Sequence, residues 1–227
     1  MPVNLDLFYQ NPVFKVLPQK KLELLAAEGV IHKYEKGQCI INAGDLWPYI
    51  FLVASGSIHA LKHSLEGRSL VVTTFLPGDI FWGLAFFYEH MPMPVSLEAT
   101  RATKIYLWST EQMHPILMGN GQFSWELSRL MIGKMARASE ILEEMAFQPV
   151  AGRLAKLLME NGQEEKLGVI QRSLTLDEMA ARIGSTREMV CRFLHRFADE
   201  GIIDITRTEY KIVDPSRLVD MVQHNKV

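Results

Sequence analysis

The chain of 227 residues suits two small domains, and its 48% hydrophobic and 22% charged residues indicate globular domains with buried cores. Its formal net charge of −2 excludes a generally basic surface, so any nucleic-acid binding must depend on locally placed cations. The two cysteines, Cys39 and Cys191, exclude a disulfide framework and a cysteine-rich metal site, which predicts a reducing, cytoplasmic location.

Other classes of protein are also disfavoured. The start MPVNLDLFYQN lacks the basic and apolar regions of a signal peptide, and no apolar run reaches the length of a membrane span. No glycine-rich phosphate loop, HExxH or GxSxG motif occurs. We therefore expect a binding protein without contact to membranes, and not an enzyme.

The N-terminal half predicts a short helical lead-in followed by many short strands. The lead-in runs to about Ala27, with Leu22, Leu24 and Leu25 on its inner side. From residue 30 to residue 108, apolar runs alternate with glycine turns, which are Lys36-Gly37, Ala43-Gly44-Asp45, Ser55-Gly56, Glu66-Gly67 and Pro77-Gly78-Asp79. The last four recur at 11 or 12 residues, a spacing typical of an antiparallel sandwich or roll, and the clearest strands are 49–53 and 70–75.

Residues 111–147 carry an apolar stripe at helical spacing, which predicts one long helix. The members of the stripe are Leu127, Met131, Met135, Ala138, Leu142 and Met145. A helix this long and apolar needs its own domain and a second helix to pack against, so we predict that it joins two copies of the chain. A single buried helix in a monomer is the alternative.

Pro149 ends this helix, because the residue before a proline is biased away from helical backbone. Residues 150–161 then predict a second amphipathic helix, and residues 163–171 predict a polar loop. Near the C-terminus, residues 202–205 and 209–213 can pair as a small hairpin. Asp214-Pro215 predicts the start of a last short helix, with Leu218, Val219 and Val222 on its apolar side.

Between the loop and the hairpin, residues 174–203 predict two short helices joined by a tight turn. Thr175 suits the N-cap of the first helix, with Glu178 at the spacing of a capping box. Gly184 suits the left-handed residue that ends this helix, and Ser185 or Thr186 can cap the next. This succession is the helix-turn-helix layout.

The second of these helices has two chemically different faces. Its apolar face carries Met189, Val190, Phe193, Leu194 and Phe197. Its polar face carries Arg187, Glu188, Cys191, Arg192, His195 and Arg196. Arginine can pair with guanine and glutamate can accept a hydrogen bond from cytosine, so this face suits DNA in the major groove. A solvated helix with mixed charges is the alternative.

The motif Ser185-Thr186-Arg187-Glu188-Met189-Val190-Cys191-Arg192 resembles the recognition helix of the Crp/Fnr regulators, and the glycine turns stand in the order found in that family. The resemblance implies an α+β chain with a cyclic-nucleotide-binding-like β-roll over residues 1–110, a dimerisation helix and hinge over 111–148, and a winged helix-turn-helix domain over 149–227. It also implies a homodimeric transcriptional regulator that binds double-stranded DNA and RNA polymerase and reads TGTGA-like half-sites. The DNA-binding residues expected from it are Thr175, Ser185, Thr186, Arg187, Glu188, Arg192, His195 and Arg196.

The resemblance fails in the sensor pocket. Family members that bind cyclic nucleotides use a glutamate, an arginine and a serine after the Pro-Gly-Asp turn, and here these positions are Gly83, Met93 and Pro94. We therefore expect that cyclic AMP is not the effector. The residues expected around the pocket are Trp82, Gly83, Leu84, Met93, Pro94 and Ser139, with Phe86, Phe87 and Met91 nearby.

Two interpretations of this pocket remain open: a closed core without a ligand, or an apolar pocket for a hydrophobic effector or for haem. The conceivable haem ligands are His32, His59, His63, His90 and His114, together with Met91 and Met93. No cysteine precedes Cys39, which disfavours an N-terminal iron–sulfur cluster. We predict no metal site and no bound cofactor.

Two residues of the polar face suggest regulation of DNA binding. His195 gains charge as the pH falls and would then bind DNA more tightly. Cys191 is a redox candidate, because an oxidised thiol would place bulk and charge against the DNA, although a cysteine that merely fits there is the alternative. A ligand-binding or scaffold module that has lost DNA binding is the competing class of function.

Overall fold

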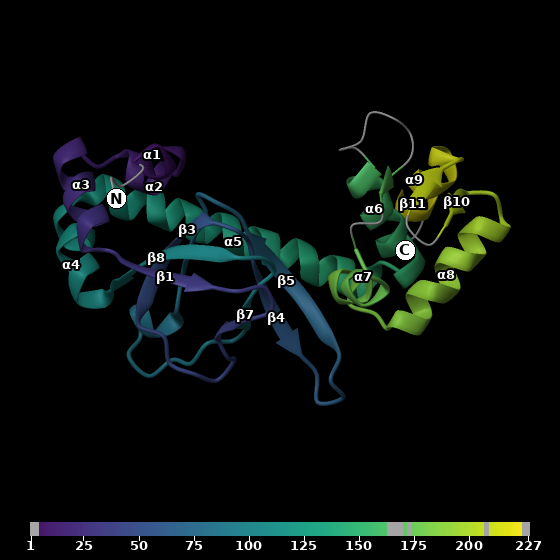
Figure 1. Cartoon of the computed structure of the whole chain (residues 1–227), viewed down its shortest axis with the longest axis horizontal. Helices are drawn as coiled ribbons and strands as arrows, with labels where there is room; N and C mark the ends of the chain where they lie inside the picture. The colour runs from purple at the N-terminus through teal and green to yellow at the C-terminus, as the bar shows by residue number, and fades with distance from the viewer. Residues whose placement is uncertain (1–4, 163–169, 172–173, 207–208, 224–227) are drawn as a thin grey trace. The chain divides into compact units, whose positions relative to one another are not determined.

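The computed structural model describes residues 5–162, 170–171, 174–206 and 209–223, and Figure 1 shows its helices and strands. The chain forms two compact units. The first comprises the described residues up to Lys62 together with Val72–Arg137, and the second comprises His63–Val71 together with the described residues from Ala138 onward. Within the described ranges, no helix is long and apolar enough to cross a membrane.

The helical lead-in is divided into short helices, which are α1 (Asp6–Gln10), α2 (Pro12–Lys15) and α3 (Gln19–Glu28). Asn11 separates the first two, because its side-chain oxygen accepts a hydrogen bond from the Val13 backbone N–H at 2.9 Å and so caps α2. Leu22 and Leu25 are buried as predicted, whereas Leu24 was wrongly placed on the inner side and is exposed.

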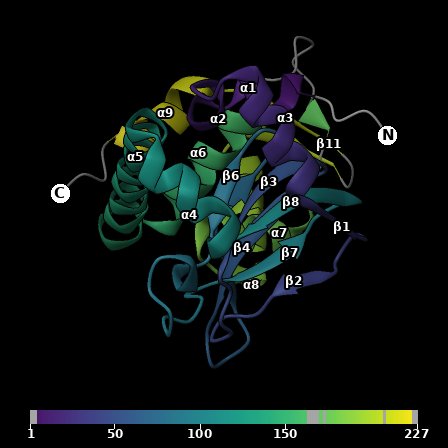
Figure 2. The same ribbon diagram turned by 90° about the vertical axis from the view of Figure 1, so that its left-hand side faces the viewer.

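The strands form the predicted antiparallel roll of two sheets. One sheet has the order β1 (Val30–Tyr34), β8 (Thr103–Ser109), β3 (Tyr49–Ser55) and β6 (Ile80–Trp82), which Figure 2 shows side by side. The other has the order β2 (Cys39–Ile41), β7 (Ser96–Ala99), β4 (Ile58–His63) and β5 (Ser69–Phe75). A single 3₁₀ turn, η1 (Leu84–Phe86), follows β6.

Strand β3 is buried on both faces because each face meets a different core. Ile50 and Leu52 pack with the helical layer, and Phe51 and Val53 pack between the two sheets. The same alternation occurs on β8, where Trp108 joins the helical side and donates its indole N–H to the Leu25 carbonyl at 2.7 Å. Side chains on a strand point to opposite faces in turn, so this sheet separates two hydrophobic clusters.

The predicted turns are confirmed by their backbone angles. The glycines with positive φ include Gly37, Gly44, Gly56, Gly67 and Gly78, one in each predicted turn. At Gly56 the φ of 89° is combined with close packing, since an added Cβ would lie 2.3 Å from the Thr103 hydroxyl oxygen. Only glycine meets both conditions without strain.

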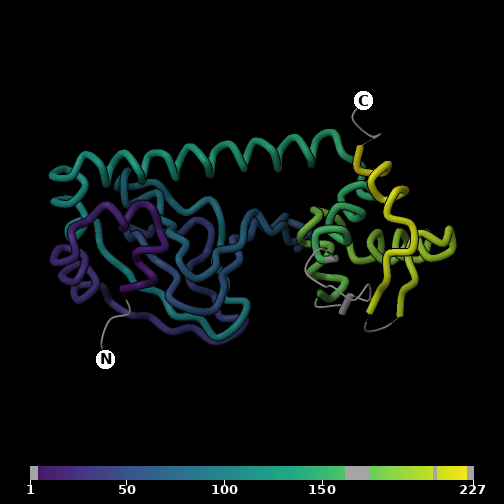
Figure 3. Tube along the Cα trace, turned by 90° about the horizontal axis from the view of Figure 1, so that it is seen from above, coloured from purple at the N-terminus to yellow at the C-terminus, as the bar shows by residue number. Residues whose placement is uncertain are grey.

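The helical segment after the roll is two helices, and the prediction of one helix over residues 111–147 was wrong. Helix α4 (Thr110–Gly119) begins at a capping box formed by Ser109 and Gln112. Asn120 then adopts extended backbone, and its side chain caps α5 (Gly121–Phe147) by accepting the Phe123 N–H at 3.0 Å. Figure 3 shows α5 as one continuous helix after this break.

The C-terminal elements are α6 (Val150–Gly162), β9 (Ile170–Gln171), α7 (Leu176–Ile183), α8 (Arg187–Asp199), β10 (Ile203–Ile205), β11 (Glu209–Ile212) and α9 (Pro215–Gln223). The predicted hairpin is confirmed by the pairing of β10 with β11. The predicted polar loop over residues 163–171 needs correction, because Ile170 and Gln171 pair with β11 as a third strand, while residues 163–169 lie outside the described ranges.

One hydrophobic core fixes these C-terminal elements to each other. It contains the buried faces of α6, α7 and α8, with Leu154, Val190 and Phe197 among the fully buried residues. Tyr210 on β11 is also buried, and its hydroxyl donates to the Leu158 carbonyl at 2.9 Å. The packing therefore gives α8 a rigid support and leaves its other side exposed.

Candidate nucleic-acid interface

Helix α7 starts at the predicted capping box. The Thr175 hydroxyl accepts from the Glu178 N–H at 3.2 Å, and the Glu178 carboxylate accepts from the Thr175 N–H at 2.7 Å. These two bonds satisfy backbone donors that a helix start leaves unpaired. The Thr175 side chain is exposed, but its hydroxyl is hydrogen-bonded to Glu178. In this structure Thr175 therefore acts as the N-cap of α7.

The turn between α7 and α8 follows the predicted scheme. Gly184 is left-handed with φ of 61°, and the Gly184 and Ser185 N–H groups both reach the Ala180 carbonyl. Thr186, not Ser185, caps α8, because its hydroxyl oxygen accepts from the Met189 N–H at 3.3 Å. From α6, the Arg153 Nε donates to the Ile183 carbonyl at 2.8 Å and so satisfies the end of α7.

Helix α8 buries one face and exposes the other. Val190, Leu194 and Phe197 are almost completely buried. The exposed residues of the helix are Arg187, Glu188, Arg192, His195, Arg196 and Asp199. At 100° per residue, Glu188, Arg192 and His195 lie at the middle of the exposed face, and Arg187 and Arg196 lie on its two flanks. Asp199 shares the middle of this face and was not part of the predicted set.

Among the described residues, Arg192 and His195 have no hydrogen bond or ion pair, so their polar atoms face solvent. Arg187 differs, because its Nη1 lies 2.9 Å from the Asp177 carboxylate of α7. Both partners are more than half exposed, so this ion pair contributes little to stability and can open when a phosphate or base competes for the guanidinium.

Glu188 is held as a carboxylate at the N-terminus of α8. Its own backbone N–H, and then the Thr186 hydroxyl, donate hydrogen bonds that lower the pKa of the Glu188 side chain below its usual value. A carboxylate that stays charged is a hydrogen-bond acceptor only, which is the property required to accept from the amino group of cytosine.

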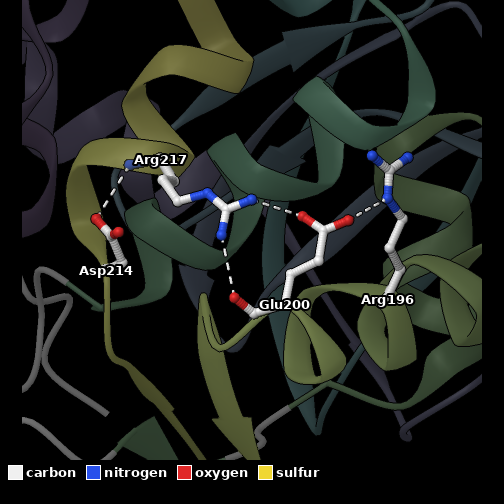
Figure 4. Close-up of polar contacts among 4 residues, drawn as sticks. All are labelled: Arg196, Glu200, Asp214 and Arg217. Carbon is white, nitrogen blue, oxygen red and sulfur yellow. Dashed lines mark hydrogen bonds and ion pairs between the residues drawn. The ribbon is translucent and has the colours of Figure 1, made fainter.

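Arg196 belongs to a surface network that sequence reasoning missed (Figure 4). Its Nε donates to one oxygen of the Glu200 carboxylate at 2.8 Å, and Nη2 of Arg217 lies 2.8 Å from the other oxygen. Arg217 also donates to the Glu200 backbone carbonyl at 3.0 Å, and its backbone N–H donates to Asp214, the N-cap residue of α9. The network joins the C-terminal end of α8 to the start of α9. Of its parts, the sequence predicted only the helix start at Asp214-Pro215.

Cys191 lies between the buried and exposed faces of α8. Its side chain is half-buried, on the flank that also carries Arg187. The thiol is therefore accessible at the edge of the candidate interface, as its role as a redox candidate requires, but it is not at the centre of the exposed face.

The apolar stripe predicted on α5 combines two faces of the helix. Leu127 is 2% exposed and belongs to the core of the first unit, with Met131 packed against it, so neither is available to a partner. Met135 and Leu142 are about 70% exposed, Ala138 is exposed and Met145 is half-buried. The exposed face instead carries large apolar and small residues at a spacing of three and four residues, which are Trp125, Ser128, Ile132, Met135, Ser139, Leu142 and Ala146.

The structure divides the predicted effector residues between different environments. Trp82 packs on the helical side of its sheet, and Met93 is 2% exposed in the core between the sheets. The Gly83 N–H donates to the Tyr49 carbonyl, and an added Cβ would lie 1.8 Å from the Trp47 carbonyl oxygen. Leu84 opens η1, whereas Pro94 and Ser139 are exposed. Of the positions expected from the resemblance, Gly83 and Met93 are therefore packed, whereas Pro94 and Ser139 are exposed.

The histidines considered as haem ligands do not gather. His32, His63, His90 and His114 are exposed on different elements, and His63 shares a hydrogen bond of 3.0 Å with Ser69. In the described part of the chain, no group of three histidine, cysteine or acidic side chains could hold a metal ion.

Comparisons with known proteins identify both halves of the chain. Residues 31–120 match the family model of the cyclic nucleotide-binding domain, and residues 152–221 match that of the Crp-like helix-turn-helix domain. The chain is 26% identical over 192 residues to a CRP-like cAMP-activated global transcriptional regulator of Mycobacterium tuberculosis, covering 82% of this chain and 84% of the relative. It is 24% identical over 186 residues to the cAMP-activated global transcriptional regulator CRP of Salmonella typhimurium, covering 80% and 89% of the two chains.

Solved structures share the fold at low sequence identity. The c-di-GMP responsive global regulator of Xanthomonas campestris superposes with a TM-score of 0.74 at 19% identity, covering 83% of this chain and 95% of that one. A CRP/FNR-family transcriptional regulator of Thermus thermophilus superposes with a TM-score of 0.69 at 21% identity, covering 86% and 100% of the two chains. These likenesses confirm the predicted arrangement of β-roll, long helix and helix-turn-helix domain.

Proposed function

This chain belongs to the Crp/Fnr family of DNA-binding transcriptional regulators, and from that premise we propose that it acts as a homodimer reading a two-fold symmetric DNA site. The observation that carries the proposal is the exposed face of α8. Glu188, Arg192 and His195 project from a helix whose other face is fixed in a core, so they are presented rigidly. A helix of this kind enters the major groove with its first residues on the bases.

The chemistry of this face supports base reading. Arg192 has its guanidinium free of ion pairs among the described residues, and Glu188 is kept charged by the Thr186 hydroxyl and its own N–H. A guanidinium matches the two acceptors of guanine, and a carboxylate matches the amino donor of cytosine. Together with the family resemblance, these groups favour half-sites like TGTGA, with Arg187 and Arg192 on guanines.

The exposed seam of α5 supports the homodimer. Trp125, Ile132, Met135 and Leu142 are between 64% and 72% exposed, and they alternate with small residues at coiled-coil spacing. Large exposed apolar side chains arranged along one line mark an interaction surface, and a seam at three-four spacing fits a second helix of the same kind. We propose this seam as the dimer interface, in place of the stripe through Leu127 and Met131.

We also propose that cyclic AMP does not regulate this protein. The phosphate-binding arginine and serine of the family correspond to Met93 and Pro94, and Met93 is packed in the core. Without the family's arginine, a phosphate buried beside Met93 would lack that counter-charge, which is unfavourable. Calorimetry should show no tight binding of cyclic AMP, and a micromolar affinity accompanied by tighter DNA binding would overturn this proposal.

A direct experiment separates a DNA-binding regulator from a scaffold module. Fluorescence anisotropy would compare a palindromic duplex with TGTGA-like half-sites against a scrambled duplex of the same composition, at several salt concentrations. We expect the palindrome to bind at least about a thousandfold more tightly, as specific sites do over non-specific DNA. Equal binding of the two duplexes would contradict sequence-specific recognition, and no binding to either at low salt would favour the scaffold module.

A further inference from the structure

One carboxylate at the C-terminal end of α8 binds two guanidinium groups (Figure 4). One oxygen of Glu200 accepts the Nε hydrogen of Arg196 at 2.8 Å, and the other oxygen lies 2.8 Å from Nη2 of Arg217. Asp214 does not share in this pairing, because its carboxylate accepts hydrogen bonds from the first turn of α9, including the Ser216 N–H at 3.1 Å. The three ion-paired side chains therefore carry one negative and two positive charges, which leaves a net charge of +1.

Arg196 keeps part of its guanidinium free in this arrangement. Only its Nε is bonded to Glu200, and no described residue accepts a hydrogen bond from its two Nη groups, which Figure 4 shows turned away from Glu200. The Arg196 side chain is 57% exposed. Two neighbouring N–H donors of a guanidinium bind a phosphate in bidentate fashion. One edge of the Arg196 guanidinium is thus held by the protein, while the other edge is available to an anion.

The position of Arg196 on α8 indicates which anion this is. A helix in the major groove directs the middle of its exposed face to the bases, so its flanks face the walls of the groove, which are the sugar-phosphate backbones. Arg192 lies at the middle of this face, whereas Arg196 lies one turn further along and on a flank. The anion within reach of Arg196 is therefore a phosphate of the DNA backbone.

Arg217 determines how strongly Arg196 attracts such a phosphate. Without Arg217, the carboxylate of Glu200 and the guanidinium of Arg196 would form a neutral pair, and the repulsion of the carboxylate would offset much of the attraction. The second guanidinium offsets the charge of Glu200, so the network remains a net cation. Arg217 is also fixed in place, because its Nη1 donates to the Glu200 backbone carbonyl at 3.0 Å.

We propose that Glu200 and Arg217 are positioning residues for DNA binding, which act through Arg196. Glu200 holds the Nε of Arg196, Arg217 offsets the charge of Glu200, and the free Nη groups of Arg196 bind a backbone phosphate. Phosphates carry no sequence information, so these residues set the overall affinity for DNA and leave the choice of sequence to Glu188 and Arg192. This inference rests on the proposed function as a DNA-binding regulator.

Anisotropy titrations of the full-length protein with the palindromic and the scrambled duplex test the charge balance. Arg217→Met removes the compensating charge and should weaken binding to both duplexes by the same factor. We expect about threefold or more, because exposed charge interactions are individually small but a dimer contains two copies. Arg217→Lys keeps the charge and should retain most of the affinity. Unchanged binding of Arg217→Met, or a loss of the preference for the palindrome, would overturn the proposal.

Two double variants show whether Arg217 acts through its partners. Glu200→Gln combined with Arg217→Met restores the native net charge, and the glutamine oxygen still accepts from the Nε of Arg196, so the affinity should return close to the native value. In protein that carries Arg196→Met, the further change Arg217→Met should have no effect. A full effect of Arg217→Met in the absence of Arg196 would mean that Arg217 contacts DNA itself or shapes the domain, and the positioning role would be refuted.

Arg101→Met and Glu89→Gln are the matched controls, because both residues are exposed on the roll, outside the second unit, and each variant changes the net charge by one. They should change DNA binding less than the network variants do, and an equal effect would mean that only the total charge matters. Urea unfolding confirms that each variant is folded. Native protein that binds neither duplex would overturn the proposed function together with this inference, whereas native binding that Arg217→Met leaves unchanged overturns this inference alone.

Discussion

At the scale of single residues, Arg192 is the sharpest test of base reading. It is exposed at the middle of α8 and forms no ion pair with a described residue, so its removal leaves the fold unchanged. Arg192→Ala should cost about 1–3 kcal/mol of binding to the preferred duplex and relax the preference at one base pair. Anisotropy with single-base duplex variants measures this, with Arg101→Ala on the roll as control. An equal loss on every duplex would instead indicate a phosphate contact.

Glu200 gives a pH-dependent prediction. Its pKa is lowered, first by the hydrogen bond from Arg196 and further by the charges of Arg196 and Arg217. A carboxylate with a lowered folded pKa adds stability above its unfolded pKa of about 4.3 and loses it as the pH falls through the folded value. Native protein should therefore lose stability more steeply than Glu200→Gln as the pH falls below about 4.5.

Urea unfolding between neutral and acid pH measures this difference, with Glu89→Gln as an exposed control. Because Glu200 is at the surface, added salt should shrink the effect. Parallel curves for native protein and Glu200→Gln across the acid range would show that the network of Figure 4 does not contribute to stability.

Cys191 supplies a redox prediction at the same scale. It is half-buried on the flank of α8 beside Arg187, so an oxidised sulfur would enter the edge of the DNA interface. If it acts as a switch, mild peroxide should weaken DNA binding of native protein and of Cys39→Ser, and leave Cys191→Ser unchanged. The same response in native protein and Cys191→Ser would show that Cys191 is not a redox switch and is only a small side chain that packs at this position.

Local chemistry explains which residues sequence reasoning placed correctly. The capping box of Thr175 and Glu178 and the left-handed Gly184 depend on residues at most a few positions apart, so their pattern is readable in the sequence. The pairing of Arg187 with Asp177 and of Arg217 with Glu200 joins residues 10 and 17 positions apart. Such contacts depend on how two helices meet, which no spacing rule in the sequence states.

At the scale of elements, a substitution in the exposed seam of α5 should affect dimerisation without affecting folding. Leu142→Glu places a charge in the seam and should dissociate the dimer and weaken DNA binding, because a buried unpaired charge is costly. Gln122→Glu introduces the same charge on an exposed position of α5 outside the seam and should have neither effect. Sedimentation velocity measures the dimer, and an intact Leu142→Glu dimer would contradict the proposed interface.

Leu127 should behave in the opposite way, because it is buried in the core of its own unit. Leu127→Ala should lower the free energy of unfolding by about 2–5 kcal/mol, as large-to-small core substitutions do, while the protein that remains folded still dimerises. Urea unfolding and sedimentation on the same sample distinguish the two roles. If Leu127→Ala dissociated the dimer without lowering the free energy of unfolding, Leu127 would belong to the dimer interface and not to the core.

The contrast between these two residues shows why the exposed face of α5 was only partly predictable. Every third or fourth residue of α5 is apolar on two neighbouring faces, and hydrophobic periodicity alone does not tell which face meets the roll. The break between α4 and α5 at Asn120 could not be predicted for a similar reason, because Met113, Ile116 and Leu117 continue the apolar pattern into α4. Only the tertiary packing decides these questions.

At the scale of the whole molecule, fold and family were predictable because they depend on many elements at once. An effector could not be predicted in the same way, because effector binding depends on a few side chains, and the sequence departs from the family pattern at Gly83, Met93 and Pro94. Lys134 interrupts an apolar stripe in the sequence, and only the structure places its ammonium over the Phe75 ring.

The final prediction concerns the two-fold geometry of the complex. A homodimer should place its two α8 helices in successive major grooves, with half-site centres about 34 Å apart. Inserting five base pairs between the half-sites turns one of them to the far side of the duplex, because five base pairs are about half a helical turn. Only one protomer can then engage, so the affinity should fall to that of a single half-site.

The salt dependence of binding makes the same test quantitative. The slope of log affinity against log salt counts the neutralised phosphates, at about −0.9 for each. Loss of one protomer's contacts should therefore reduce the slope to about half, whereas the same five base pairs inserted outside the palindrome should change neither slope nor affinity. A slope that is unchanged by the central insertion would mean that one protomer makes all the contacts, and the two-fold mode of binding would have to be abandoned.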